Sequence, residues 1–258
     1  MKSLASATNR RQLGYFHGIK AEVVDHNVLG KPANALLIHL PEARNSLSGR
    51  QGFKKVEAVC NCYLPQGLWG LLHEKPSART GYFREVIRCV LGDSVAKRKI
   101  DILSTGVTMD ELAWVEESYQ EQWVLAFVTA GVETNALRLG VDKAGNIERK
   151  GQFEPVGTIN TIVITSSSLS QAAMAGAFIT ITEGKVIALE DLDIKSSYTP
   201  ELQASGTGTD QIVIISGDGD RVTYVGGHSK LGELMARAVT QATKSALMKR
   251  QEGTKKAR

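Results

Sequence analysis

The sequence predicts an α/β fold, a single layered domain in which a mixed β-sheet is packed by helices. Two continuous apolar runs of strand length, residues 123–129 and 158–165, are typical of strands buried on both faces. A third observation is an amphipathic helix near the C-terminus, where apolar residues recur every three or four positions after Ser229 as its N-cap. The sequence contains no convincing domain linker and no internal repeat. We therefore expect one domain over residues 1–243, with most motifs in residues 123–243, and a small N-terminal subdomain within it is the alternative.

The net charge of +4 comes from the end of the chain. Residues 244–258 carry six Lys or Arg and one Glu, so residues 1–243 have a net charge of −1. This basic C-terminal tail lacks aromatic side chains for base stacking, which argues against a nucleic-acid partner. The three cysteines are too few for a disulfide framework and favour reduced thiols in a cytosol.

One uncharged stretch, residues 155–182, is long enough to cross a bilayer. It contains nine Ser or Thr residues, however, and its centre is hydroxyl-rich. A strand, a polar turn and a buried helix therefore describe it better than a membrane span. At the N-terminus, Arg10 and Arg11 are followed by polar and charged residues rather than by the apolar stretch of a signal peptide. We expect a soluble, cytoplasmic protein with no membrane partner.

The first half of the chain has weaker patterns. Residues 1–33 show little periodicity, and residues 44–52 read as a polar loop. We expect strands at 34–40, 56–64 and 100–106, a short helix at 83–91, and a second helix at 109–120 with Thr108 as its N-cap.

The second half continues this alternation after a polar turn or hairpin at residues 142–152. Ser168 and Gln171 resemble a capping box for a helix that reaches about residue 189. Within it, the β-branched residues 178–182 fit a helix or a strand. Strands are expected at 211–216 and 221–225, and the last helix should run for roughly 20 residues before it frays into the basic tail.

Three glycine-rich or hydroxyl-rich junctions follow or precede the predicted strands, at residues 129–132, 206–210 and 226–228. Layered α/β folds often bind ligands at such loops, although glycine is also the ordinary turn residue. Residues 206–210 do not form a phosphate-binding loop, because a strand follows them and no Gly-Lys-Ser/Thr is present. They offer two hydroxyls and one carboxylate, those of Thr207, Thr209 and Asp210.

His228 is the histidine best placed for catalysis. It precedes a helix N-terminus and Lys230, which together favour the neutral imidazole that a general base needs. Asp210 could orient this histidine or a water molecule, or simply cap a turn. A surface histidine in a loop is the alternative for His228, and for Glu233 the alternative is a charge that only complements the helix dipole.

Two amides and one carboxylate complete the candidates. Asn160 interrupts an apolar strand and Asn135 follows a strand-end glycine, so either could hold an oxyanion or pin a loop. Glu183 lies in an otherwise apolar helix, where it could act as an acid or base. An ion pair with Lys185 at the helix end is the alternative.

The sequence does not indicate a metal site or a cofactor. Cys60 and Cys62 share one face of a strand, but zinc needs further ligands and His73 is the nearest candidate. The nucleophile elbow, the HExxH motif and the dinucleotide fingerprint are absent from the sequence.

Four segments of the second half together resemble the adenosylcobinamide amidohydrolase family. They are VTAGVETNALRLG (128–140), GTINTIVITSSSLSQAAMAGAFITITEGKVIALEDL (157–192), SGTGTDQIVIISG (205–217) and YVGGHSKLGELMARAV (224–239). In the first half only NALLIHLPEARNS and CNCYLP are similar. The motifs of the family fall on Asn135, Thr158, Asn160, Thr207, Thr209, Asp210, His228 and Glu233.

This resemblance implies an enzyme of corrinoid salvage. It would hydrolyse the amide that joins the aminopropanol arm to the corrin ring of adenosylcobinamide, giving adenosylcobyric acid and 1-amino-2-propanol. The corrinoid is then a substrate rather than a cofactor. Two alternatives are a corrinoid-binding protein without hydrolysis and an amidohydrolase acting on complete pseudo-cobalamins.

The candidate residues are compatible with two mechanisms. In the first, His228 oriented by Asp210 activates water, Asn135 or Asn160 holds the oxyanion, and Glu183 protonates the leaving amine. In the second, Thr207 or Thr209 is an activated nucleophile that forms an acyl-enzyme.

Overall fold

The structure is a computed structural model that describes residues 5–68, 76–91, 99–143 and 158–256. It divides into two compact units. The first unit comprises Met1–Ala43 and Lys55–Met109, and the second comprises Arg44–Lys54 and Asp110–Arg258. The prediction that residues 1–243 form one domain stays a prediction.

The first unit is a sheet of five strands with one long helix among its described residues. The strand order is β1-β2-β3-β4-β5, and β4 and β5 are parallel. Helix α2 lies against β1 and β2. The bounds are β1 Ala5–Phe16, β2 Ile19–Val28, β3 Lys31–Ser48, β4 Gly52–Tyr63, a 3-10 turn η1 Gln66–Leu68, α2 Pro76–Leu91 and β5 Ile100–Thr105.

Tight turns explain the antiparallel β1-β2-β3 arrangement. His17 and Gly18 both have positive φ, at 49° and 81°, and Leu29 and Gly30 repeat the pattern at 50° and 74°. Two consecutive residues with positive φ match the right-handed twist of the strands that they connect. The sequence did not predict β1 and β2. Most of β1 is exposed and therefore lacks an apolar periodicity, and in the largely buried β2 polar and charged residues interrupt the apolar ones.

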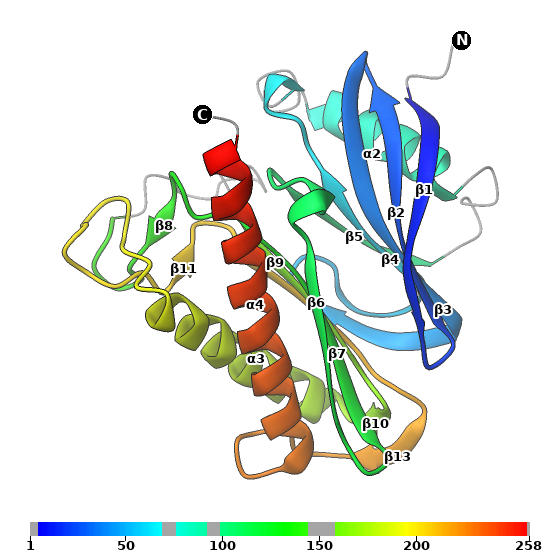
Figure 1. Cartoon of the computed structure of the whole chain (residues 1–258). Helices are drawn as coiled ribbons and strands as arrows, with labels where there is room; N and C mark the ends of the chain where they lie inside the picture. The colour runs from blue at the N-terminus through cyan, green and yellow to red at the C-terminus, as the bar shows by residue number, and fades with distance from the viewer. Residues whose placement is uncertain (1–4, 69–75, 92–98, 144–157, 257–258) are drawn as a thin grey trace. The chain divides into compact units, whose positions relative to one another are not determined.

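The second unit contains the mixed sheet around which the rest of this unit packs (Figure 1). Its strand order is the end of β3, then β12, β9, β7 and β6, with β12 and β9 parallel and the other pairs antiparallel. These four strands are β6 Ala113–Tyr119, β7 Gln122–Ala130, β9 Ile159–Thr165 and β12 Gln211–Ile215. All seven residues of β9 are buried, as a continuous apolar run predicts.

Two long helices cover this sheet, α3 from Gln171 to Asp191 and α4 from Lys230 to Lys256. Their buried faces join β7 and β9 in one apolar core that includes Met174, Ile181 and Met235. Two small sheets and one 3-10 turn complete the unit: β8 Ala136–Leu137 with β11 Gly206–Thr207, β10 Ser167–Leu169 with β13 Gly219–Val222, and η3 Met109–Glu111, which begins at the last residue of the first unit. The predicted α/β class, with a mixed sheet packed by helices, is confirmed.

Several predicted elements were wrong in type or extent. Residues 109–120 form η3 and then the strand β6 rather than a helix, because pairing of all seven β6 residues with β7 outweighs local helix propensity. The N-cap of α3 is Ser170, whose side chain accepts a hydrogen bond from Ala173 N at 3.1 Å, whereas Ser168 belongs to β10. Residues 178–182 are helical.

The ends of one strand and one helix also differ from their predicted positions. Strand β3 continues to Ser48 through most of the predicted loop 44–52. Helix α4 extends to Lys256, so the basic segment expected to fray is helical almost to its end. The hairpin predicted at 142–152 lies outside the described residues from position 144 onward.

One described helix, α3, is long and apolar enough to cross a membrane by length and composition alone. Half of its apolar window is buried in the core. A core helix passes the same test, so this feature is weak evidence for a membrane span.

Gly217 lies where the chain that leaves β12 passes very close to the segment before α3. A Cβ atom there would lie 2.0 Å from the carbonyl oxygen of Ser166, so we expect Gly217→Ala to lower the free energy of unfolding by about 1–3 kcal/mol. Gly176 is the matched control, since a Cβ atom at this position in α3 meets nothing within 4 Å. Gly176→Ala should raise the free energy of unfolding by about 0.5–1 kcal/mol through helix propensity. Urea denaturation of both variants measures the two changes in the free energy of unfolding. Equal changes would contradict the close approach of the backbone at Gly217.

Candidate active site

Asp210 is the centre of a polar cluster in the second unit. Its Oδ1 accepts hydrogen bonds from Thr207 Oγ1 at 2.5 Å and from Ile159 N at 3.1 Å. Its Oδ2 accepts from Lys185 Nζ at 2.6 Å, in an ion pair whose lysine is 9% exposed. Thr207 N also donates to this carboxylate, at 3.2 Å. One carboxylate thus joins the start of β9, helix α3 and the loop before β12.

The glycine in this loop is required by the close approach of the ion pair. A Cβ atom at Gly206 would lie 2.4 Å from Asp210 Oδ2 and 2.7 Å from Lys185 Nζ. Both distances are shorter than real Cβ contacts, so a side chain at this position would have to displace the two charged groups of the ion pair. This explains why a glycine precedes Thr207 without a phosphate-binding role.

Two further side chains join the cluster at the start of β9. Thr158 Oγ1 lies 2.6 Å from the carbonyl oxygen of Thr209, to which it donates, and 3.2 Å from Asn160 Oδ1. Thr158 and Asn160 are both buried. Parallel pairing sets Asn160 opposite Gln211, the residue after Asp210, and this register brings the two predicted motifs together.

Asn135 lies at the border of the same region. It is buried and directly precedes β8, where Ala136 pairs with Thr207 of β11. The loop before it is tied to the C-terminal helix, because Arg250 Nε lies 2.7 Å from Glu133 Oε1 and Arg250 Nη1 lies 2.7 Å from Glu111 Oε2. Burial raises the pKa of Glu111, and the hydrogen bond from Arg250 opposes that rise. The basic end of α4 therefore holds the loop that leads to Asn135.

His228 and Glu183 do not join this cluster. His228 is exposed in the turn before α4, where Ser229 Oγ accepts a hydrogen bond from Gly232 N at 3.0 Å as the predicted N-cap. Among the described residues, the hydrogen bonds of Asp210 are with Lys185, Thr207 and Ile159, so the predicted His228–Asp210 pair is not formed. Glu233 pairs with Lys230 at 2.5 Å on the exposed first turn of α4, and Lys230 lowers its pKa.

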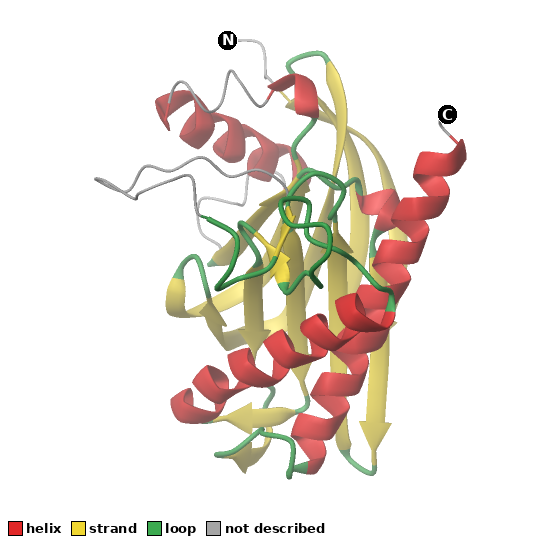
Figure 2. Cartoon of the chain, turned by 90° about the vertical axis from the view of Figure 1, so that its left-hand side faces the viewer, coloured by secondary structure: helices red, strands yellow, loops and turns green. Residues whose placement is uncertain are grey.

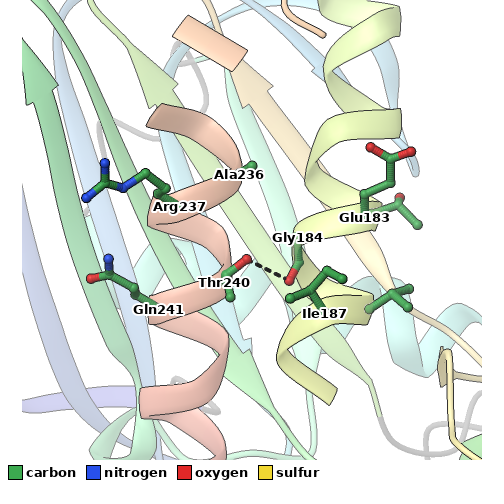
Figure 3. Close-up of a pocket in the computed structure, with 9 residues that line it drawn as sticks. Glu183, Gly184, Ile187, Ala236, Arg237, Thr240 and Gln241 are labelled. Carbon is green, nitrogen blue, oxygen red and sulfur yellow. Dashed lines mark hydrogen bonds between the residues drawn. The ribbon is translucent and has the colours of Figure 1, made fainter. Parts of the chain in front are cut away.

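Glu183 lines a separate apolar pocket between α3 and α4 (Figure 3). The pocket has a volume of about 730 Å³, and Gly184, Ile187 and Arg237 also line it. Thr240 Oγ1 donates to the carbonyl oxygen of Gly184 at 3.0 Å at its floor. Lys185 reaches Asp210 instead of pairing with Glu183, which places the polar cluster and the pocket on different faces of α3.

Lys185 is the member of the cluster that sequence reasoning did not assign to the site. It was considered only as a partner of Glu183. The sequence did contain a signal for this role, since Lys185 lies in a helix whose first twelve residues carry no charge. A lysine buried in such a helix needs a carboxylate partner.

The two predicted strand cysteines form a buried pair in the first unit. Their Sγ atoms lie 3.4 Å apart, and this hydrogen bond together with burial raises the pKa of Cys60 well above its ordinary value. Within the described part of the chain, no three His, Cys, Asp or Glu residues gather as metal ligands, and His73 lies outside it. The absence of a metal and of a cofactor stays a prediction.

A family model described as adenosylcobinamide amidohydrolase matches residues 19–255. This match spans both units and every residue of the Asp210 cluster. The chain belongs to the adenosylcobinamide amidohydrolase family. It is therefore an amidohydrolase, and the predicted family and enzyme class are confirmed.

Two relatives cover most of this amidohydrolase. Uncharacterized protein MJ1613 of Methanocaldococcus jannaschii is 40% identical over 245 residues, 89% of this chain and 93% of its own length. A Methanosarcina mazei protein named adenosylcobinamide amidohydrolase is 26% identical over 78% of this chain and 88% of its own length. Among solved structures, the PH0078 protein of Pyrococcus horikoshii OT3 matches with a TM-score of 0.43 and 11% identity, covering 84% of this chain and 78% of that chain.

A second carboxylate, Asp142, clamps the two turns that flank β8 and β11 in this amidohydrolase. It accepts hydrogen bonds from Ser196 Oγ at 2.6 Å, from Thr199 Oγ1 at 2.5 Å and from Arg138 N at 2.5 Å. These hydrogen bonds lower the pKa of Asp142, with the bond from Ser196 contributing most. Residues 138–142 and 196–199 are thus held to each other by one side chain.

Removing Lys185 from its pair with Asp210 should leave a partly buried carboxylate without its counter-charge. We expect Lys185→Met to lower the free energy of unfolding by about 3 kcal/mol, and Asp210→Asn in the same background to restore at least about 1 kcal/mol. Lys195→Met is the matched control, since its ion pair with Asp193 at 2.6 Å is largely exposed and should contribute less than about 1 kcal/mol. A double-mutant cycle by urea denaturation checks this, and simple additivity would contradict the coupling.

The Asp142 clamp should appear in the pH dependence of stability. Because the folded pKa lies below that of the unfolded chain, the carboxylate stabilises the fold at neutral pH, and this contribution is lost as the pH falls through the folded value. We expect Asp142→Asn to be less stable than the wild type at pH 7, with the difference shrinking below about pH 4. Denaturation midpoints at several pH values measure it. Asp220→Asn, at an exposed position of β13, is the matched control, and it should leave the denaturation midpoint at pH 7 close to that of the wild type.

Proposed function

We propose that this amidohydrolase cleaves the amide between the aminopropanol arm and the corrin ring of adenosylcobinamide. The products would be adenosylcobyric acid and 1-amino-2-propanol, and the reaction would serve corrinoid salvage in the cytoplasm. The family match and the name of the Methanosarcina mazei relative support this substrate. In the same proposal the corrinoid is a substrate, and the enzyme uses neither nucleic acid nor membrane as a partner.

The hydrogen bond from Thr207 Oγ1 to Asp210 Oδ1, at 2.5 Å, carries the mechanistic proposal. A hydroxyl that donates to a carboxylate has a base positioned for its proton, and the Asp210 side chain is only 18% exposed. Lys185 compensates the charge on the other carboxylate oxygen, 2.6 Å away. The geometry therefore favours the threonine-nucleophile mechanism over attack by water activated at the exposed His228.

The steps balance in protons and bonds. Thr207 Oγ1 attacks the amide carbon of the corrin side chain while Asp210 takes the hydroxyl proton. Asp210 then gives that proton to the departing nitrogen, the carbon–nitrogen bond breaks, and 1-amino-2-propanol leaves an ester on Thr207. Water then attacks the ester carbon while Asp210 takes a proton from it. The carbon–oxygen bond to Thr207 breaks, Asp210 returns the proton to Thr207 Oγ1, and adenosylcobyric acid leaves. The amides of Asn135 and Asn160 border the site and would stabilise the negative oxygen.

Thr158 is the second buried hydroxyl at this site, and it is the natural competitor for the nucleophile role. Its oxygen lies against the carbonyl of Thr209 and the side-chain oxygen of Asn160, and neither group is a base at neutral pH. Asp210 in contrast is a carboxylate in contact with Thr207. This difference assigns attack to Thr207 and a positioning role to Thr158.

Purified protein incubated with adenosylcobinamide should release adenosylcobyric acid and 1-amino-2-propanol, detected by mass spectrometry with and without a chelator. We expect Thr207→Val and Asp210→Asn to reduce kcat by about 100-fold or more, because each removes part of the nucleophile and base. Thr207→Ser should retain part of the activity. Peptide mapping of a quenched reaction should place an acyl adduct on residue 207.

Other results would point elsewhere. An adduct on Thr158 would overturn the assignment to Thr207, and loss of turnover in His228→Ala with Thr207→Val active would restore the water mechanism. Binding of adenosylcobinamide without any product would favour the corrinoid-binding alternative. Faster turnover of complete pseudo-cobalamins in a competition assay would identify those as the substrate.

A further inference from the structure

Two turns beside the site expose large apolar side chains to solvent. Leu139 is 68% exposed, Val141 is 55% exposed and Tyr198 is 61% exposed. The first two belong to the turn at residues 138–142, and Tyr198 belongs to the turn at 196–199. Apolar residues gathered in this way on loops next to a polar site are a common feature of ligand-binding surfaces.

These turns have a defined conformation. Asp142 accepts hydrogen bonds from both of them, and Ser196 Oγ accepts a further hydrogen bond from Tyr198 N at 3.0 Å. Val141 N and Asp142 N both donate to the carbonyl oxygen of Arg138. The exposed side chains are therefore carried on a braced backbone, which lowers the entropy lost when a ligand binds.

The same turns are hydrogen-bonded to the strands of the polar cluster. Ser197 N donates to the carbonyl oxygen of Ala136 at 2.8 Å, and Ala136 pairs with Thr207. Leu139 N donates to Ser205 Oγ at 2.9 Å, directly before Gly206. Figure 2 shows these loops gathered around β8 and β11 at the C-terminal end of α3.

We propose that Leu139, Val141 and Tyr198 form a platform that binds an apolar face of the corrin ring. This inference rests on the proposed function, since it assigns the ring of that substrate to a surface beside Thr207. A corrin is a broad ring with apolar faces and amide side chains at its rim. Seating one face on the platform would leave a rim amide to reach Asp210 and Thr207, and ring binding would be separate from the chemistry.

The apolar pocket between α3 and α4 is the competing place for the ring. It is lined by Ile187, Glu183 and Arg237, and the side chain of Lys185 reaches Asp210 rather than this pocket. The platform in contrast is joined through Ala136 and Ser205 to the strand that carries Thr207. Because these hydrogen bonds place the platform beside Thr207, we assign the ring to the platform rather than to the pocket.

The test measures ring binding apart from hydrolysis. Dissociation constants are obtained by equilibrium dialysis with the corrin absorbance. Adenosylcobyric acid, which lacks the scissile arm, is measured with active protein, and adenosylcobinamide is measured in a Thr207→Val background that should not hydrolyse it. We expect the double variant Leu139→Ser/Tyr198→Ser to raise both constants, and KM, about tenfold, while kcat changes by less than about twofold. Both positions are exposed, so the variant should fold.

Two variants serve as controls. Tyr224→Ser removes a tyrosine that is 58% exposed on the segment before α4, and it should leave the dissociation constants unchanged. Ile187→Ser changes the pocket between the helices, and it should also leave them unchanged. A rise in Kd for Ile187→Ser but not for the double variant would move the ring to that pocket and overturn the platform.

The remaining outcomes separate this inference from the proposed function. Wild-type hydrolysis with an unchanged KM in the double variant would overturn the platform alone. Corrinoid binding that weakens in the double variant, without hydrolysis by the wild type, would support the platform and overturn the proposed reaction. Wild-type protein that binds neither corrinoid would contradict both.

Discussion

The ion pair between Lys185 and Asp210 organises the active-site region of this amidohydrolase. Lys185 is buried in a helix whose first twelve residues carry no charge, and an ammonium in such a place requires a carboxylate within contact distance. Asp210 meets this need with one oxygen and accepts hydrogen bonds from Thr207 and Ile159 with the other. The position of the loop at 206–210 relative to α3 and β9 follows from that single carboxylate.

Two other charged side chains support the site from outside the cluster. Arg250 holds the loop before Asn135 through Glu133, so the basic end of the chain is a structural part of the second unit rather than an appendage. Asp142 joins the two turns beside β8 and β11. The reactive groups therefore lie on segments that other side chains fix, which is the arrangement that amide hydrolysis needs.

In the second unit, the strands and helices that are buried in the core could be predicted from the sequence. Strands β7 and β9 and the amphipathic face of α4 follow from apolar residues alone, because burial on a sheet or on one helix face leaves a clear periodicity. Strands β1 and β6 were missed because both have largely exposed or partly exposed residues, and their pairing partners decide their conformation.

For the site, the sequence by itself determined the family and the enzyme class. It also pointed to six members of the polar cluster and its border: Asn135, Thr158, Asn160, Thr207, Thr209 and Asp210. Only the tertiary structure decided that Asp210 pairs with Lys185 rather than with His228, and that Glu183 faces a separate pocket. The physical reason is that a partner 25 positions away depends on the rotation of α3 and on the register between β9 and β12. Local sequence patterns record burial, whereas these long-range geometric relations arise only when the chain is folded.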